Sequence, residues 1–152
     1  MADMAHLNSE SAKHIAHAFA DAINHQSVEG IADLMTEDHV FVDSLGSRIA
    51  GKERMKVGWE GYFRMVPDYT IAIEETFLDG KEVVMLGTAQ GTYSTDGVLR
   101  PENKWSTPAA WRALIRGSLV AEWRIYADNE PIRQIMARCA ARSSPDHGEA
   151  HG

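Results

Sequence analysis

The chain has a single cysteine, Cys139, among its 152 residues. One cysteine excludes an intramolecular disulfide framework and is typical of a reducing compartment, so we expect a cytoplasmic location. No apolar run approaches the roughly 20 residues that a membrane-spanning helix requires. Residues 1–25 also lack the continuous apolar segment of an export signal. We therefore expect no membrane partner.

Basic residues are outnumbered as well, with 15 Lys and Arg against 22 Asp and Glu and a formal net charge of -7. A nucleic-acid-binding protein needs a local basic patch to contact phosphates, and none is visible in the sequence, so we expect no nucleic-acid partner. Hydrophobic residues make up 44% and charged residues 24%, which is ordinary for a globular protein. The length suits one domain with one core.

The first half of the chain has the pattern of three helices and one short strand. Apolar residues recur at steps of three and four over 9–25, which predicts an amphipathic helix. A shorter helix is expected over 27–35 and a third over 52–65. Between them, residues 39–43 are rich in strand formers and precede a glycine turn. This strand is expected to end on the carboxylate of Asp43.

The second half is predicted to be an antiparallel meander, because Asp-Gly and Arg-Gly pairs typical of tight hairpins separate its apolar segments. The four expected strands cover about 69–78, 82–94, 104–115 and 118–127. Pro108 cannot donate to a strand ladder, so its strand is expected to lie at an edge or to contain a bulge. A short helix should follow from Glu130, where proline is tolerated in the first turn.

These elements predict an α+β fold, with the helices packed on one face of a strongly curved antiparallel sheet. The expected domain covers residues 9–141, after an N-terminal extension over 1–8. Residues 142–152 contain too little apolar surface to dock and are expected to form a disordered tail.

The order of these elements, and the closing run from Trp123 through Arg124 and Tyr126 to Asp128, resemble the nuclear transport factor 2-like superfamily, specifically its SnoaL-like branch. The resemblance covers about residues 10–137. It implies a sheet bent into a cone, lidded by the N-terminal helices, with a pocket inside and a convex outer face that often forms a homodimer. Because unrelated chemistries share this fold, the reaction must be argued from the site.

The segment from Phe41 to Gly46 is similar to the part of ketosteroid isomerase that carries its general base, and Asp43 falls on that base. That enzyme also needs two hydrogen-bond donors for the developing oxyanion. By spacing, those donors correspond to Phe19 and to Ala109 or Ala110, whose side chains cannot donate. Losing one such donor typically costs on the order of 10² to 10³ in rate, so steroid isomerisation by that mechanism is not expected.

The closing strand is similar to that of limonene epoxide hydrolase, whose final aspartate is catalytic and corresponds to Asp128. That enzyme also uses an arginine and an aspartate on an earlier strand. The corresponding residues 87–90 of this chain are Gly-Thr-Ala-Gln and supply neither. SnoaL-type polyketide cyclases require fewer catalytic residues, because one pocket aspartate acts as acid and base without metal or cofactor. The resemblance to these cyclases therefore needs only one such aspartate in this chain.

We therefore expect a cofactor-independent enzyme in which aspartate acts as acid and base on an apolar carbonyl or epoxide compound. The alternative is a non-catalytic module of the same fold that binds a small ligand or dimerises. The candidate catalytic residues are Asp43, Asp128 and Tyr126, and the candidate substrate-binding residues are Phe19, Phe41, Trp59, Phe63 and Arg124.

Each carboxylate also has a structural interpretation. Asp43 precedes a glycine turn, where aspartate is favoured because its side chain bonds nearby amides. Asp128 comes just before the last helix and is a candidate N-cap. The polar face of the closing strand, with Arg124 and Tyr126, is expected to form the inner wall of the cone, and the Trp123 face is expected to form the outer wall or a dimer contact. No metal site is expected, because the histidines lack ligand spacing.

Overall fold

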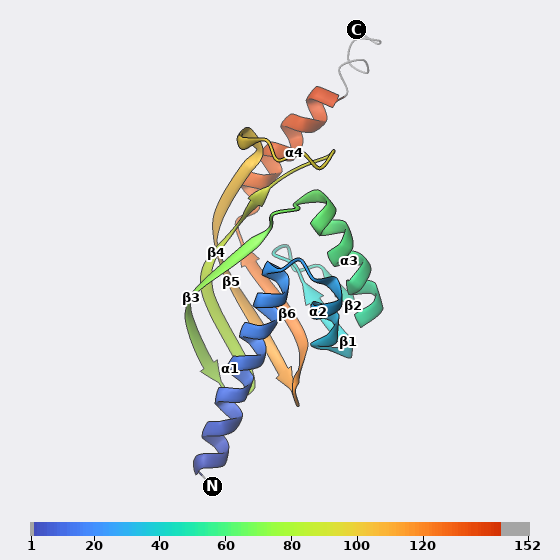
Figure 1. Ribbon diagram of the computed structural model, residues 1–152. Helices are drawn as coiled ribbons and strands as arrows, with labels where there is room; N and C mark the ends of the chain where they lie inside the picture. The colour runs from blue at the N-terminus through green and yellow to red at the C-terminus, as the bar shows by residue number, and fades with distance from the viewer. Residues whose placement is uncertain (1, 144–152) are drawn as a thin grey trace.

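The computed structural model describes residues 2–143 and contains an α+β fold (Figure 1). The elements in chain order are α1 (Ala2–Asn24), α2 (Val28–Asp33), β1 (Met35–Val42), β2 (Arg48–Ala50), α3 (Lys52–Met65), β3 (Thr70–Asp79), β4 (Glu82–Thr92), η1 (Pro101–Asn103), β5 (Lys104–Arg116), β6 (Leu119–Ala127) and α4 (Glu130–Ser143). None of the described helices is long and apolar enough to cross a membrane.

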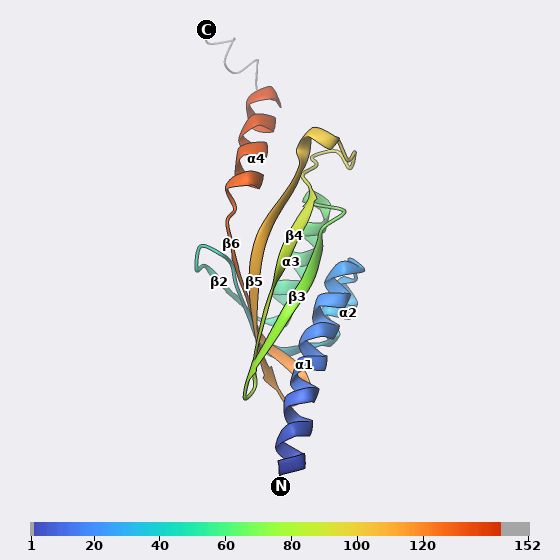
Figure 2. The same ribbon diagram turned by 90° about the vertical axis from the view of Figure 1, so that its left-hand side faces the viewer.

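The six strands form one curved sheet in the order β2-β1-β6-β5-β4-β3. Only β1 and β6 pair in parallel, and the other neighbours are antiparallel. Figures 1 and 2 show α1, α2 and α3 beside the sheet, with α4 extending from the end opposite the N-terminus. The expected α+β cone with a C-terminal helix is therefore confirmed.

The helices form where the apolar spacing predicts them. Helix α3 has the predicted bounds, whereas α1 begins at Ala2 and so includes most of the expected N-terminal extension. The hydroxyl of Ser27 accepts a hydrogen bond from the Gly30 N–H at 3.0 Å, which caps α2. The predicted disordered tail over 142–152 lies mostly outside the described residues.

Two of the predicted hairpins are present, and each has a glycine with positive φ, Gly80 and Gly117, both at 65°. The expectation of an edge strand at Pro108 holds only locally, because β5 as a whole is central and pairs with β4 through Pro108 without a register shift there. The pairing of β5 with β6 begins only at Ala109. Pro108 therefore has a neighbouring strand, β4, on one side only.

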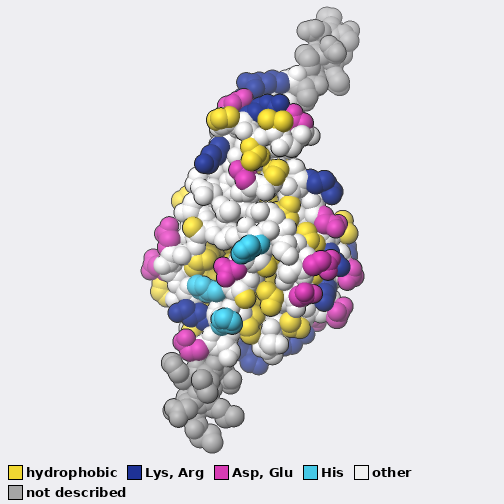
Figure 3. Space-filling model, in the orientation of Figure 1, with side chains coloured by type: hydrophobic (Ala, Val, Ile, Leu, Met, Phe, Trp, Pro, Cys, Tyr) yellow, Lys and Arg dark blue, Asp and Glu magenta, His cyan; other side chains and the backbone are white. Residues whose placement is uncertain are grey.

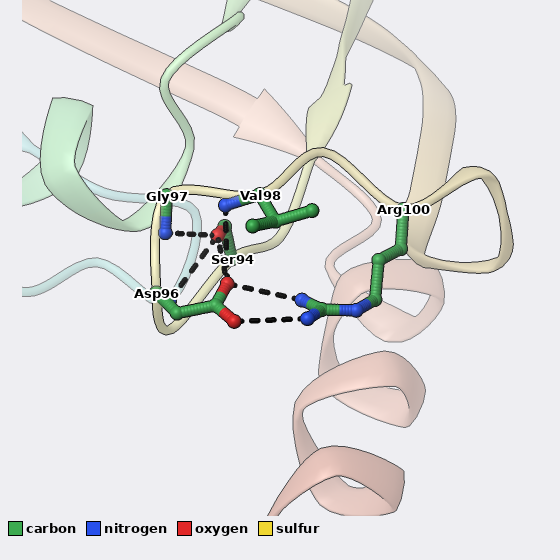
Figure 4. Close-up of polar contacts among 5 residues, drawn as sticks. All are labelled: Ser94, Asp96, Gly97, Val98 and Arg100. Carbon is green, nitrogen blue, oxygen red and sulfur yellow. Dashed lines mark hydrogen bonds and ion pairs between the residues drawn. The ribbon is translucent and has the colours of Figure 1, made fainter.

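The third expected hairpin, at Asp96-Gly97, is instead a longer loop closed by side chains (Figure 4). The Ser94 Oγ accepts from the N–H of Gly97 at 2.8 Å, and the Asp96 Oδ1 accepts from the N–H of Val98 at 3.0 Å. Arg100 binds both carboxylate oxygens of Asp96 at 3.0 and 2.9 Å and holds the pKa of that carboxyl well below its usual range. These contacts order the loop without a strand-to-strand turn.

The two faces of β6 are the reverse of the expected arrangement. Trp123 is 1% exposed and packs against Phe19 of α1, with ring centroids 4.6 Å apart, so its face is the inner one. Tyr126 is 45% exposed on the outer face, where the Arg124 guanidinium lies 4.6 Å from its ring centroid. The physical reason is that α1 covers the inner face, so apolar side chains must point there.

His39 of β1, which was not among the candidate residues, is part of the core between the inner face of the sheet and α1. His39 on β1 is 0% exposed, its Nδ1 lies 2.7 Å from the carbonyl oxygen of Val120, and its ring stacks on Phe19. Its Nε2 is buried without a partner in the described part of the chain. Burial lowers the pKa of His39, against the opposing effects of the Val120 hydrogen bond and of the charges on Glu122 and Asp38.

Stability should therefore fall as the solution becomes mildly acidic. The lowered pKa means that the unfolded chain binds a proton more readily than the folded one, so the contribution is present above the ordinary histidine pKa of 6.5 and is lost as pH falls through the folded-state pKa. Urea unfolding between pH 7.5 and 5 measures this slope, which is at most about 1.4 kcal/mol per pH unit for one proton. A His39→Gln variant should lose this dependence of the unfolding free energy on pH. An unchanged slope in that variant would show that another group causes it.

Candidate functional site

A cavity of about 300 Å³ lies between the inner face of the sheet and α3. This volume is at the lower end of the range of small-molecule sites. Most of its lining is aromatic or aliphatic. The lining residues are Phe41, Asp43, Ser44, Ile49, Met55, Gly58, Trp59, Tyr62, Tyr69, Trp111, Trp123, Ile125 and Asn129.

Asp43 is the only charged residue among those that line the cavity. It follows β1 directly, and its Oδ1 accepts hydrogen bonds from the backbone N–H groups of Leu45 and Ser47, both at 2.9 Å. Within residues 2–143 no donor bonds its Oδ2 and no basic side chain pairs with it. One oxygen of Asp43 therefore orders the turn, as the structural interpretation expects, and the residue also lines the cavity.

The polar end of the cavity joins two distant parts of the chain. Ser44 follows β1 and Asn129 follows β6, and the Asn129 side-chain amide donates a hydrogen bond to the Ser44 hydroxyl. Both residues line the cavity beside Asp43. The carboxylate, a hydroxyl and an amide thus gather at one end, whereas the rest of the wall is mainly apolar.

Helix α3 supplies an aromatic wall built around Trp59. Its ring stacks on Phe63 with centroids 5.4 Å apart and meets Phe41 of β1 edge to face at 6.1 Å. Phe41 and Trp59 line the cavity, as the sequence predicts, and Phe63 supports Trp59 from outside the lining. Phe19 is fully buried and packs behind Trp123, so it belongs to the core rather than to the cavity wall.

Two tyrosines add phenol groups to this apolar wall. Tyr62 of α3 and Tyr69, which precedes β3, meet edge to face with ring centroids 4.9 Å apart. Burial raises the pKa of both phenols, and the nearby Tyr62 raises that of Tyr69 further, against a hydrogen bond from the Trp111 indole. Both groups therefore keep their protons at neutral pH and are hydrogen-bond donors.

The remaining predicted site residues lie outside the cavity. Asp128 is exposed, and its Oδ1 accepts a hydrogen bond at 2.9 Å from the N–H of Glu130, the first residue of α4, which is an Asx-turn that leads into the helix. Tyr126 and Arg124 lie on the outer face of β6. Asp43 and Asp128 consequently do not form a catalytic pair inside one pocket.

The described residues contain no group of three or more His, Cys, Asp and Glu side chains that could hold a metal ion. Histidines gather over the face formed by α1, where His14 and His25 are exposed (Figure 3). On that face basic side chains are interspersed with acidic ones.

Tyr69 and Trp111 line the cavity although the sequence did not predict them there, and Trp123 and Ile125 lie on the inner face of the sheet rather than on the expected outer one. A signal for the second pair was present. Along β5 the apolar residues Trp105, Trp111 and Ile115 share one face, and Lys104, Arg112 and Arg116 share the other. Ile125 is the register partner of Trp111. That alternation marks the inner face of β5 and, through the pairing, the inner face of β6.

Comparison with known proteins gives the same architecture. A putative SnoaL-like polyketide cyclase from Shewanella denitrificans is 15% identical with a TM-score of 0.72, over 84% of this chain and 97% of that one. A limonene-epoxide-hydrolase-like enzyme from M. tuberculosis is 18% identical with a TM-score of 0.70, over 90% and 98%. At these identities the likeness shows the fold.

A third solved structure, a hypothetical protein from Catenulispora acidiphila with a ketosteroid isomerase-like fold, was obtained in complex with trimethylamine. It is 18% identical with a TM-score of 0.64, over 74% of this chain and 83% of that one. Comparison with curated proteins gives no match. The model of the SnoaL-like domain family matches residues 16–129, which include all three N-terminal helices in part or whole and the entire sheet. The chain therefore belongs to the SnoaL-like domain family.

Proposed function

We propose that this chain binds a small, largely apolar carbonyl compound in the cavity and that Asp43 exchanges a proton with it, without metal or cofactor. The observation that carries the proposal is the position of Asp43 as the single charged group of an otherwise mainly apolar cavity. A carboxylate with one oxygen fixed by two backbone amides and the other free is positioned for general acid–base catalysis.

The volume and the wall of the cavity set the kind of ligand. About 300 Å³ bounded mainly by aromatic side chains suits a compact molecule with one ring. The trimethylamine complex of the Catenulispora acidiphila relative supports small-molecule binding in this fold. An epoxide substrate is less well supported, because Asp128, which corresponds to the catalytic aspartate of limonene epoxide hydrolase, lies outside the cavity.

Proton exchange at a carbon next to a carbonyl tests the proposal without knowledge of the natural substrate. Acetophenone and a panel of small cyclic ketones are incubated with the protein in D₂O, and loss of the α-proton signals is followed by ¹H NMR. We expect exchange above the buffer rate for ketones that fit the cavity. Binding of these ketones without any enhanced exchange would contradict the catalytic part of the proposal.

The second candidate, a non-catalytic ligand-binding module, is favoured by a specific observation. The two carboxylates are separated, and the Oδ1 of Asp43 has a structural task in the β1–β2 turn. In that case the same ketones bind but do not exchange, so the experiment distinguishes the two functions.

We also propose that the chain forms a homodimer through the outer face of the sheet. A row of apolar side chains, Leu86, Ala110 and Tyr126, crosses β4, β5 and β6 at paired positions, and Phe77 of β3 lies on the same face at 52% exposure. The face also carries both charge signs, because Arg112 pairs with Glu82 and Glu122. A mixed apolar and charged surface of this kind can be self-complementary, as a two-fold interface requires.

Leu86→Glu should convert such a dimer to a monomer, because the new charge would be buried at the interface. Light scattering coupled to size exclusion should give twice the chain mass of 16.8 kDa for the wild type and 16.8 kDa for the variant. Val57→Glu, on an exposed position of α3 away from this face, is the matched control and should stay dimeric. A monomeric wild type at micromolar concentration would rule out the dimer.

A further inference from the structure

The cavity has a negatively charged residue in its lining and no positively charged one. Asp43 lines it, and none of the described lysine, arginine or histidine residues does. The two basic residues that follow Asp43 most closely in the sequence pair with other acids. An Arg48 guanidinium nitrogen lies 3.6 Å from the Glu122 Oε1. The Lys52 Nζ lies 3.6 Å from the Glu37 Oε2. Within residues 2–143 no basic side chain therefore balances the charge of Asp43.

The wall around this charge is aromatic more than aliphatic. The chain contains four Trp, four Tyr and four Phe, and six of these residues line the cavity. They are Phe41, Trp59, Tyr62, Tyr69, Trp111 and Trp123. The face of an aromatic ring carries partial negative charge, so such a wall attracts a cation as well as apolar groups. Aliphatic side chains would bury apolar groups without this attraction.

Contacts among the rings hold part of this wall in position. Phe63 stacks on Trp59 from outside the lining, with ring centroids 5.4 Å apart. Trp59 also meets Phe41 and Tyr62 edge to face, at 6.1 and 6.2 Å between centroids. A ring that is already fixed loses little conformational entropy when a ligand packs on it, so the wall is preorganised for binding.

We propose that the cavity selects a carbonyl compound that carries an alkylated ammonium group over a neutral compound of the same shape. This inference rests on the proposed function, because it names a further group on the ligand of the same cavity. The positive charge would balance that of Asp43, and the alkyl groups would pack on the aromatic wall. The net charge of -7 also favours the approach of cations over that of anions.

The lining also indicates which kind of cation fits. A primary ammonium group has three N–H donors. The polar lining side chains gather mainly at the end beside Asp43, so donors that face the aromatic wall would stay unsatisfied. An alkylated nitrogen has fewer such donors or none. A metal ion is disfavoured, because the described residues contain no group of three or more His, Cys, Asp and Glu side chains that could hold one.

Two ketones of the same shape test this selection. Acetonyltrimethylammonium and 4,4-dimethylpentan-2-one differ only in the charged nitrogen that replaces the quaternary carbon. We expect the charged ketone to bind the wild-type protein at least about tenfold more tightly than the neutral one. Isothermal titration calorimetry gives both dissociation constants.

Two variants separate the contribution of the charge from that of the wall. Asp43→Asn removes the charge, and it should reduce the preference to about threefold or less and change the affinity for the neutral ketone by less than about twofold. Phe41→Leu replaces a ring of the lining with an aliphatic side chain. It should weaken binding of the charged ketone about two- to fivefold more than that of the neutral one.

Asp21→Asn is the matched control for the loss of a negative charge. Asp21 is exposed on α1 and does not line the cavity, so this variant should keep the full preference for the charged ketone. A preference that is lost equally in Asp21→Asn and in Asp43→Asn would mean that the overall charge of the protein causes it, and this would overturn the assignment to the cavity.

Equal affinities of the two ketones for the wild-type protein would overturn the inference while ketone binding in the cavity still stands. An undiminished preference in Asp43→Asn would overturn it as well. If neither ketone binds the wild-type protein, the proposed function fails and this inference fails with it. A preference for the charged ketone without α-proton exchange supports the inference and removes only the catalytic role of Asp43.

Discussion

Replacing Asp43 with Asn is expected to reduce the α-proton exchange of a cavity-bound ketone by at least about 100-fold. The amide cannot take the proton, and general-base catalysis by a positioned carboxylate is typically worth 10² to 10⁴ in rate. The fold should be retained, because the asparagine oxygen can still accept hydrogen bonds from Leu45 and Ser47. Exchange is followed by ¹H NMR in D₂O at equal ketone occupancy, together with the thermal unfolding midpoint.

Asp128→Asn is the matched control, since Asp128 lies outside the cavity and the amide oxygen of asparagine can still accept the hydrogen bond from Glu130. This variant should exchange α-protons at the wild-type rate. Retained exchange in Asp43→Asn would exclude Asp43 as the base. Loss of exchange in Asp128→Asn at unchanged stability would mean that Asp128 reaches the ligand in solution.

Trp123→Ala is expected to destabilise the protein by about 3–5 kcal/mol, the usual cost of truncating a large buried aromatic side chain. Trp123 is 1% exposed and contacts Phe19 across the interface between β6 and α1. The change enlarges the cavity and removes one of the contacts that hold α1 to the sheet. Urea titration followed by circular dichroism gives the free energy of unfolding.

Tyr126→Ala, three positions along the same strand, is the control for the orientation of β6. Tyr126 is 45% exposed, so its truncation should cost less than about 1 kcal/mol once any contribution from dimerisation is removed by measurement at low protein concentration. A larger cost for Tyr126→Ala than for Trp123→Ala would reverse the two faces and contradict the structure.

Most of the fold could be predicted because its signals are local. The apolar spacing that predicts a helix over 52–65 depends only on residues within that segment, and the observed helix has the same bounds. Gly80 and Gly117 mark two hairpins because each adopts a positive φ that other residues disfavour. Strand boundaries set by such turns agree with the prediction to within two residues.

Features that depend on neighbours distant in the sequence could not be predicted in the same way. Pro108 is typical of an edge strand, yet β5 is central. The proline is tolerated because the pairing with β6 stops at Ala109, which leaves Pro108 with a neighbouring strand on one side only. The Asp96-Gly97 pair is typical of a tight hairpin, but Arg100 and Ser94 bind Asp96 and order a longer loop. The sequence pattern alone specifies neither where the pairing of β6 with β5 stops nor which side chains bind Asp96.

The site could be predicted only in part, because the inner face of β6 also depends on elements distant in the sequence. Alternation along β6 separates its residues into two faces but does not say which face meets the helices. A polar face was expected inside because a reactive site needs polar groups, whereas the cavity walls are mainly aromatic. The polar side chains of β6 lie on the outer face, where Glu122 forms an ion pair with Arg112 of β5 and Arg124 lies over the ring of Tyr126. Asp43 lines the cavity because it follows β1 at the point where the turn begins.

The central claim, that the cavity beside Asp43 is the ligand site, is tested most directly by ¹H–¹³C methyl NMR during a titration with acetophenone. The methyl groups of Ile49, Met55 and Ile125 line the cavity, so their resonances should shift in a saturable manner. Those of Leu86 and Leu114, on the outer face, should not shift. Saturable shifts confined to Leu86 and Leu114, with none at the three cavity residues, would contradict the assignment of the site.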